Sequence, residues 1–292
     1  MNIELRLAQK KEAIDRKLES ILPRGDSLLY QAMRYSVLGG GKRFRPLLLL
    51  SSGEEFGVRA EDALPFACAV ELIHNYSLVH DDLPSMDDDD FRRGEPSCHK
   101  AFGEDIALLT GDALLTLAFE VMASAPLKRG SDTQKEQAIV ELSLHAGTEG
   151  MIGGQLLDIT LSPETISKEL FHELIQKKTA ALITASVRIG AILGGANESQ
   201  MEAITAFGEN IGLAFQTRDD LLDALEDTQR EDAYRPNSVS LFGLDKAIER
   251  LDAFVSEGLQ ALVRGAFASE ELRFLAKKLL VVKNKGKNEH NS

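Results

Sequence analysis

Residues 80–94 read HDDLPSMDDDDFRRG, and this stretch determines how the rest of the chain is interpreted. Six aspartates fall within the ten residues Asp81–Asp90, and Arg92 and Arg93 follow at once. Carboxylates so close repel one another, which raises their pKa values or requires a cation. Mg²⁺ uses one or two carboxylates together with phosphate oxygens, and guanidinium groups bind phosphate bidentately. The stretch therefore indicates a site for a metal and a diphosphate. The alternative is a solvated acidic loop, which most charge runs are.

The composition bounds the function. The chain has 292 residues, of which 43% are hydrophobic, and its formal net charge is -13. So acidic a protein is a poor general binder of nucleic acid or of an anionic membrane surface. An anionic substrate would therefore have to be held by local cations.

The cysteines and the apolar runs predict a location. Cys68 and Cys98 have no paired spacing, which is typical of a reducing compartment and argues against a structural zinc site. The first residues contain no apolar segment of the secretory kind, and no run of about 18 apolar residues appears, so neither a secretory signal nor a membrane span is expected. We expect a cytoplasmic protein without stable membrane insertion.

The hydrophobic pattern predicts an all-α fold. Apolar residues recur at helical spacings, and almost no alternation typical of strands appears. About ten helices with short connections indicate one domain, residues 1–282, followed by a disordered tail, 283–292. The expected helices are 2–20, 26–38, 46–55, 61–82, 105–125, 138–157, 167–193, 198–227, 241–264 and 269–282, where Asp26 or Ser27 and Ser162 or Ser167 are the candidate caps. Pro84 cannot continue a regular helix, so the first aspartates lie near a helix end.

A second aspartate cluster lies in residues 215–223, which read FQTRDDLLD. Asp219 and Asp223 are four residues apart and share a helix face, and Asp220 lies beside them. The neighbouring residues are apolar, so the helix is expected to be buried or half-buried, with its acids directed at a cation. Two unrelated clusters in an acidic protein are the alternative.

Several further segments complete a pattern. They are GGKRFRP at 40–46, His74, RRG at 92–94 and Lys178-Thr179. Together with the two aspartate clusters, and over about residues 25–260, they make the sequence resemble the trans-isoprenyl diphosphate synthases. The resemblance implies a single bundle of about ten or more helices around a central cavity, the isoprenoid synthase type I fold. It also implies a homodimer.

The resemblance implies head-to-tail condensation of isopentenyl diphosphate with an allylic diphosphate. The allylic carbon–oxygen bond breaks first, the alkene attacks the resulting cation, and the departing diphosphate takes the final proton, so no side chain is assigned as the base. About three Mg²⁺ ions, which Mn²⁺ can replace, are implied at the leaving diphosphate. The implied metal ligands are Asp81 and Asp87 for two ions, with Asp82 in support, and Asp219 for the third, with Asp220 and Asp223 close by. Lys178 is implied as a further catalytic residue.

Basic and polar residues are assigned to the two diphosphates by the same resemblance. Those implied for the allylic diphosphate are Arg92, Lys178, Thr179, Gln216 and Arg235. Those implied for isopentenyl diphosphate are Lys42, Arg45, His74 and Arg93. On their own, His74 would be interpreted as a packed core residue and Lys42 as part of a turn. Arg235 stands where the family usually has lysine, a departure that leaves the role of this loop open.

Product length is expected to depend on the helix before the first motif. Tyr76 and Ser77 precede Asp81 by about one turn, and the bulk of Tyr76 suits a wall that stops growth at a C15 chain. Two extra residues in the motif, Pro84 and Ser85, also resemble the bacterial enzymes that make farnesyl diphosphate. A C20 product is the alternative to C15. The alternative role for Tyr76 is that of an ordinary core tyrosine that does not limit the product.

Three other classes of function fit the sequence less well. An inactive regulatory subunit would be expected to lack some of the acids, and both motifs are intact. A terpene cyclase would not need Lys42, Arg45 and Arg93 for a second diphosphate. A calcium buffer would need an EF-hand loop, which the sequence lacks.

Overall fold

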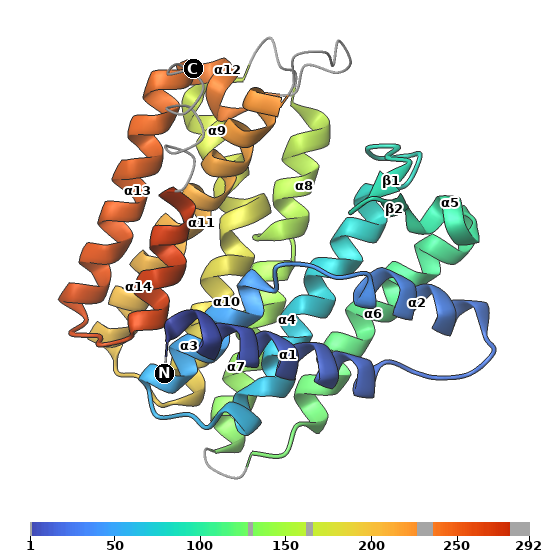
Figure 1. Cartoon of the computed structure of the whole chain (residues 1–292), viewed down its shortest axis with the longest axis horizontal. Coiled ribbons are helices and arrows are strands. Elements are labelled where there is room, and N and C mark those ends of the chain that lie inside the picture. The colour runs from blue at the N-terminus through green and yellow to red at the C-terminus, as the bar shows by residue number, and fades with distance from the viewer. Residues whose placement is uncertain (1, 128–130, 162–165, 227–235, 281–292) are drawn as a thin grey trace. The chain divides into compact units, whose positions relative to one another are not determined.

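The structure, a computed structural model, describes residues 2–127, 131–161, 166–226 and 236–280. Its described part is almost wholly helical, so the all-α prediction is confirmed (Figure 1). The exception is a two-residue antiparallel pair, β1 (Phe91–Arg92) and β2 (Glu95–Pro96), which no strand pattern in the sequence predicted. The predicted tail, 283–292, lies outside the described residues.

The chain packs as two compact units. They comprise Met1–Val140 with Ile192–Gly195, and Glu141–Ala191 with Ala196–Ser292. The prediction that residues 1–282 form a single domain stays a prediction. Each unit carries one of the two aspartate clusters.

The first unit is built around α4 (Ala60–Asp81), which packs against its neighbours on several sides. Because α4 is apolar around most of its circumference, it is buried along most of its length. Its last residue is Asp81, and Pro84 prevents the helix from continuing, so the aspartates begin where α4 ends. The other helices of this unit are α1 (Ile3–Ile21), α2 (Leu28–Leu38), α3 (Phe44–Glu55), α5 (Cys98–Phe102), α6 (Glu104–Ser124) and most of α7 (Asp132–Ala146).

Helix α6 is the one helix in the described part of the chain that is long and apolar enough to cross a membrane, judged by length and composition. The sequence predicted no membrane span, because no uninterrupted apolar run of about 18 residues occurs in it. In the structure α6 packs against α4, α2 and α5. A core helix of a folded unit has the same composition.

The second unit is organised around α11 (Glu198–Glu226), which packs against α13 (Leu244–Arg264) and the π-helix η1 (Gln176–Ala180) (Figure 1). Close backbone approach explains two glycines here. A Cβ on Gly212 would lie 2.4 Å from Cα of Ala180, and a Cβ on Gly154 would lie 2.2 Å from the backbone nitrogen of Lys178. The remaining helices are α8 (Met151–Thr160), α9 (Lys168–Ile175), α10 (Ala181–Leu193), α12 (Ser238–Phe242) and α14 (Glu270–Lys277).

Three predicted helices differ in detail. The helix expected at 138–157 is split, because α7 ends at Ala146 and α8 begins at Met151. The one expected at 241–264 is divided by Gly243, whose φ of 80° is left-handed. The one expected at 167–193 runs through α9, η1 and α10, and Ser167 caps it by accepting a hydrogen bond from the Leu170 amide at 3.1 Å.

Candidate active site

The loop after α4 closes back on the helix end. The amide of Asp87 donates to the carbonyl of Asp81 at 2.8 Å, and the amide of Met86 donates to the carbonyl of Leu83 at 2.8 Å. Asp81 and Asp87 are both half-buried, whereas Pro84 is exposed. The two predicted metal ligands of the first motif therefore belong to one tight backbone loop.

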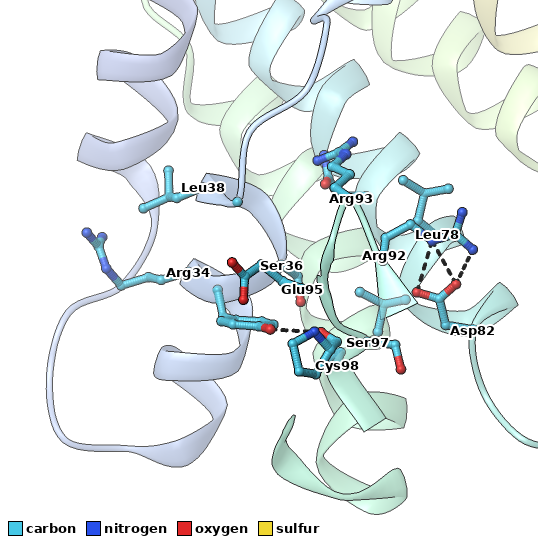
Figure 2. A pocket seen from close by; sticks show the side chains of 15 residues that line it. Arg34, Ser36, Leu38, Leu78, Asp82, Arg92, Arg93, Glu95, Ser97 and Cys98 are labelled. Carbon is cyan, nitrogen blue, oxygen red and sulfur yellow. Dashed lines mark hydrogen bonds and ion pairs between the residues drawn. The ribbon is translucent and has the colours of Figure 1, made fainter. Parts of the chain in front are cut away.

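Arg92 is anchored by the carboxylates beside it. Its Nε donates to Asp82 Oδ1 at 2.9 Å and to Oδ2 at 3.2 Å (Figure 2). Its Nη2 also donates to Asp89 at 3.0 Å. Burial raises the pKa of Asp82, although the hydrogen bond from Arg92 opposes the shift. Nη1 takes no part in these bonds. Asp82 thus holds Arg92 in place.

The β1–β2 hairpin turns at Arg93 and Gly94. Both residues have positive φ, 57° and 84°, as a two-residue type I′ turn requires. The Arg93 guanidinium donates to the carbonyl of Gly40. A Cβ on Gly41 would lie 3.2 Å from Cζ of Arg93. The hairpin therefore brings Arg93 to the segment 40–46 that sequence reasoning had grouped with it.

Arg43, which sequence reasoning left without a role, holds that segment in place. Its φ is 51°, and its side chain is buried. Nε donates to Asp15 at 2.8 Å, Nη1 to Glu71 at 2.7 Å and Nη2 to the carbonyl of Val37 at 2.8 Å. Its neighbour Lys42 is exposed. The one available signal was Glu71, a carboxylate within the apolar part of α4.

His74 lies in a positive environment. It is half-buried on α4, and its pKa is held well below the usual value by burial and by the charges of Arg45 and Arg93, with smaller contributions from Arg43 and Arg92. A neutral imidazole surrounded by guanidinium groups indicates a strong local potential for an anion. Three of the four residues assigned to isopentenyl diphosphate, His74, Arg45 and Arg93, thus act on one another electrostatically.

A cavity of about 250 Å³ lies between α2, α4 and the hairpin (Figure 2). Its wall includes Arg34, Asn75, Asp82, Arg92 and Arg93. The two arginines of the RRG segment thus line a hollow of the first unit.

Tyr76 fills space one turn before the aspartates. It is 5% exposed, and its ring meets His80 edge to face with centroids 5.8 Å apart. Burial, with a contribution from the charge of Asp81, raises the pKa of Tyr76 to about 12, so the phenol is neutral. Ser77 is half-buried, and its hydroxyl donates to the carbonyl of His74 at 3.0 Å. The bulky ring therefore lies inside the unit, close to the charge of Asp81.

The aspartates of the second cluster differ in exposure. Asp219 is half-buried and pairs with Arg218 at 3.3 Å, and Asp220 is buried. Asp223 is exposed, although the sequence predicted that it shares one face of a buried or half-buried helix with Asp219. Asp223 lies three residues before Glu226, the last residue of α11.

A chain of hydrogen bonds fixes Asp220. Thr179 Oγ1 donates to Gln216 Oε1 at 2.7 Å, and Gln216 Nε2 donates to Asp220 Oδ1 at 2.8 Å. The amide of Ser238 donates to Asp220 Oδ2 at 2.7 Å, at the start of α12. Asn237 caps that helix with a reciprocal capping box. Three predicted site residues, Thr179, Gln216 and Asp220, are thereby joined in one network.

Lys178 lies in the π-helix, a form that is rare and frequent at functional sites. Its ammonium group pairs with Asp158, a partner that sequence reasoning missed. Asp158 was one more acid on a helix, twenty residues away, and no local pattern distinguished it. Arg235 lies outside the described residues.

Each unit thus combines carboxylates with basic groups. The first offers Asp81 and Asp87 beside Arg92 and Arg93, and the second offers Asp219 and Asp220 on the helix that packs against the π-helix of Lys178. Carboxylate oxygens suit hard divalent cations, and the basic groups suit phosphate. Both groups therefore combine donors of the kinds that suit a divalent metal and a phosphate.

The helical fold and these two groups define a class, and comparison with known proteins identifies it. A sequence model of the polyprenyl synthetases matches residues 26–233, and the chain belongs to this family. Farnesyl diphosphate synthase of Bacillus subtilis is 39% identical over 92% of this chain and 94% of its own length. The large subunit 1 of the heterodimeric geranylgeranyl pyrophosphate synthase of Arabidopsis thaliana is 45% identical over 75% of this chain, which spans 61% of that plant protein. A crystal structure of an FPP/GFPP synthase from Zymomonas mobilis has a TM-score of 0.86 and 38% identity, and the match covers 96% of this chain and 99% of the other.

Proposed function

We propose that the chain condenses isopentenyl diphosphate head to tail with dimethylallyl or geranyl diphosphate, and that its product is farnesyl diphosphate (C15). The observation that carries the proposal is the junction at the end of α4. There the Asp81–Asp87 loop adjoins Arg92, which Asp82 holds in place. Carboxylates suited to a cation and a guanidinium suited to a diphosphate thus lie on one short segment.

The donor set fits Mg²⁺. Asp81, Asp87 and Asp219 offer carboxylate oxygens and no nitrogen or sulfur, which is the set that hard divalent cations prefer. We assign two ions to Asp81 and Asp87 and a third to Asp219, with Asp223 close by, so that about three Mg²⁺ (or Mn²⁺) serve the site. When bound, the metal neutralises the charge that develops on the leaving diphosphate.

The basic groups divide between two diphosphates. Arg92, with Nη1 available, is assigned to the leaving allylic diphosphate, together with Lys178, Thr179, Gln216 and Arg235. The positive environment of His74 is assigned to isopentenyl diphosphate, which must be held without losing its own diphosphate, together with Lys42, Arg45 and Arg93. The departing diphosphate takes the final proton, so the chain needs no side-chain base.

Chain length is assigned to the bulk at Tyr76, with Ser77 next to it. The bacterial relative named above makes a farnesyl product by its name, which supports C15. The Arabidopsis relative is a geranylgeranyl enzyme by its name, so a C20 product is the second candidate.

We further propose a cytoplasmic homodimer. Leu108 and Leu109 on α6 are 50% and 52% exposed, and apolar side chains at neighbouring positions of one helix suit a protein interface. The free, buried thiols of Cys68 and Cys98 suit a reducing compartment. Light scattering on the protein as it elutes from a size-exclusion column measures its mass and so tests whether it is a dimer.

The decisive experiment incubates the full chain with dimethylallyl diphosphate, isopentenyl diphosphate and Mg²⁺, followed by chromatography of the dephosphorylated products. We expect a C15 alcohol, and loss of most turnover in Asp81→Ala and in Asp219→Ala with the helical circular dichroism unchanged. Full activity in either variant would refute the metal assignment. No consumption of isopentenyl diphosphate would favour an inactive regulatory subunit.

A further inference from the structure

Asp88, Asp89 and Asp90 follow the first motif and take no part in the function proposed above except through the contact of Asp89 with Arg92. The structure brings Asp88 and Asp90 together with His99, the second residue of α5. One oxygen of each carboxylate and one ring nitrogen of His99 all lie within 4.8 Å of one another. Both aspartates are exposed, whereas His99 is 6% exposed.

The imidazole of His99 has one nitrogen satisfied and one not. Nδ1 lies 3.0 Å from Ser97 Oγ, which orients the ring. Nε2 is buried without a hydrogen-bond partner, and it lies 4.0 Å from Asp88 Oδ1, beyond hydrogen-bond distance. A buried polar atom left without a partner is costly, so native structures rarely keep one unless something else fills the gap.

A metal ion is the ligand that fits this gap. A metal-binding histidine typically donates through its other ring nitrogen to an oxygen, as Nδ1 can to Ser97 Oγ, which directs the Nε2 lone pair to the metal. The two carboxylates supply the remaining charge. Because their side chains are 62% and 60% exposed, they are free to close around an ion. Donors around a tetrahedral zinc lie about 3.3 Å apart, so small side-chain rotations suffice.

The backbone already positions the three residues. The amide of Asp88 donates to the carbonyl of Leu83 at 3.2 Å, and the amide of Ser97 donates to the carbonyl of Asp90 at 2.9 Å. These bonds tie both ends of the acidic segment to ordered structure. One competitor is present, because the ammonium group of Lys100 pairs with Asp90 at 2.7 Å.

We propose that Asp88, Asp90 and His99 bind a borderline divalent transition metal, such as Zn²⁺. The nitrogen donor distinguishes this group from Asp81 and Asp87, because Mg²⁺ prefers oxygen ligands whereas imidazole suits zinc and its neighbours. The ion would join the acidic segment to α5 and so stiffen the loop that carries Asp87. The proposal does not rest on the prenyl transfer reaction proposed above.

The test is a Zn²⁺ titration of the full chain, labelled with ¹⁵N, in the presence of excess Mg²⁺ to occupy the oxygen-only ligands. Imidazole nitrogen resonances are recorded by long-range ¹H–¹⁵N correlation, and His99 is assigned by its absence in His99→Gln. We expect Zn²⁺ to shift Nε2 of His99 first. We expect Asp88→Asn and Asp90→Asn each to weaken the affinity at least about tenfold.

Lys100→Gln is the matched control for Asp90→Asn. Both substitutions remove the same ion pair, but only the second removes a proposed ligand, so Lys100→Gln should leave Zn²⁺ affinity unchanged or strengthen it. Equal affinity in Asp88→Asn, Asp90→Asn and the parent chain would overturn the proposal, as would Nε2 of His99 found protonated and insensitive to Zn²⁺. If His99→Gln fails to fold, the two aspartate variants still decide, because their side chains are exposed.

Discussion

The guanidinium of Arg43 and the carboxylate of Glu71 form a buried ion pair, with Nη1 2.7 Å from Oε1 and the side chains 1% and 2% exposed. Although burial alone would lower it, the pKa of Arg43 is raised, because Glu71 and Asp15 stabilise the charge. The pair links the segment 40–46 to the middle of α4, so the position of Lys42 and Arg45 depends on it.

Replacing Arg43 should therefore lower the free energy of unfolding. Arg43→Met leaves the Glu71 carboxylate buried without its partner, which typically costs about 3–5 kcal/mol. Urea unfolding followed by circular dichroism measures the loss. Lys42→Met, one residue away and exposed, is the control; it should change stability by less than about 0.5 kcal/mol and instead raise the KM for isopentenyl diphosphate. Equal stability of the two variants would contradict the structural role of Arg43.

His74 should make stability depend on pH in a defined direction. Because its pKa in the folded state lies well below 6.5, the unfolded chain takes up a proton that the folded chain refuses as pH falls. The effect is absent above about pH 7.5 and grows as pH falls through about 6.5, by at most about 1.4 kcal/mol per pH unit. Unfolding curves at several pH values should show a shallower acid dependence in His74→Gln.

His172 serves as the control for that experiment. Burial and Arg250 lower its pKa as well, but it lies on α9 and carries no proposed substrate contact. His172→Gln should remove a separate share of the acid dependence and leave the KM for isopentenyl diphosphate unchanged. An acid dependence identical in His74→Gln and the parent chain would show that His74 is not held neutral.

The π-helix should be sensitive to a single methyl group. Gly212→Ala would place a Cβ 2.4 Å from Ala180, so the backbone that carries Lys178 and Thr179 must shift. Overpacking of this kind costs about 1–3 kcal/mol, and displaced binding groups commonly cost about tenfold or more in kcat/KM. Gly258→Ala is the control, because the nearest atom to its Cβ would be Cδ1 of Ile211, the flexible end of a side chain, at 3.0 Å. Steady-state kinetics with the allylic substrate varied would decide, and parallel behaviour of both variants would count against the prediction.

Tyr76 should limit the product by its bulk. Tyr76→Ala removes most of the ring and is expected to shift the product from C15 to C20 or longer, as measured by chromatography of the dephosphorylated alcohols. Tyr76→Phe keeps the ring and loses only the buried hydroxyl, so its product should remain C15. A chain-length profile that does not change in Tyr76→Ala would rule out this residue as the wall.

Local chemistry made part of this structure predictable. Pro84 and the apolar residues before it located the end of α4, and with it the first aspartates, from sequence alone. Helical periodicity also located α11, although it grouped Asp219 with Asp223, which is exposed. The segments assigned to isopentenyl diphosphate turned out to interact, since the guanidinium of Arg93 reaches Gly40.

What could not be predicted depends on contacts between distant segments. The pairing of Lys178 with Asp158 and the buried role of Arg43 exist only after helices pack. The π-helix leaves no periodic signature over five residues. The hairpin at Arg93-Gly94 was hidden because its first turn residue is arginine, where asparagine is the usual signal for a positive φ.

The hydrogen bond from the amide of Asp87 to the carbonyl of Asp81 also explains how a motif can change length. That bond closes the loop at its base, and the added residues Pro84 and Ser85 are exposed at its outer side. The spacing of the two acids along the chain is thereby uncoupled from their spacing in the molecule. Insertions at the tip of this loop can therefore accumulate during evolution without moving Asp81 and Asp87 apart. Related proteins are expected to differ in sequence at this tip.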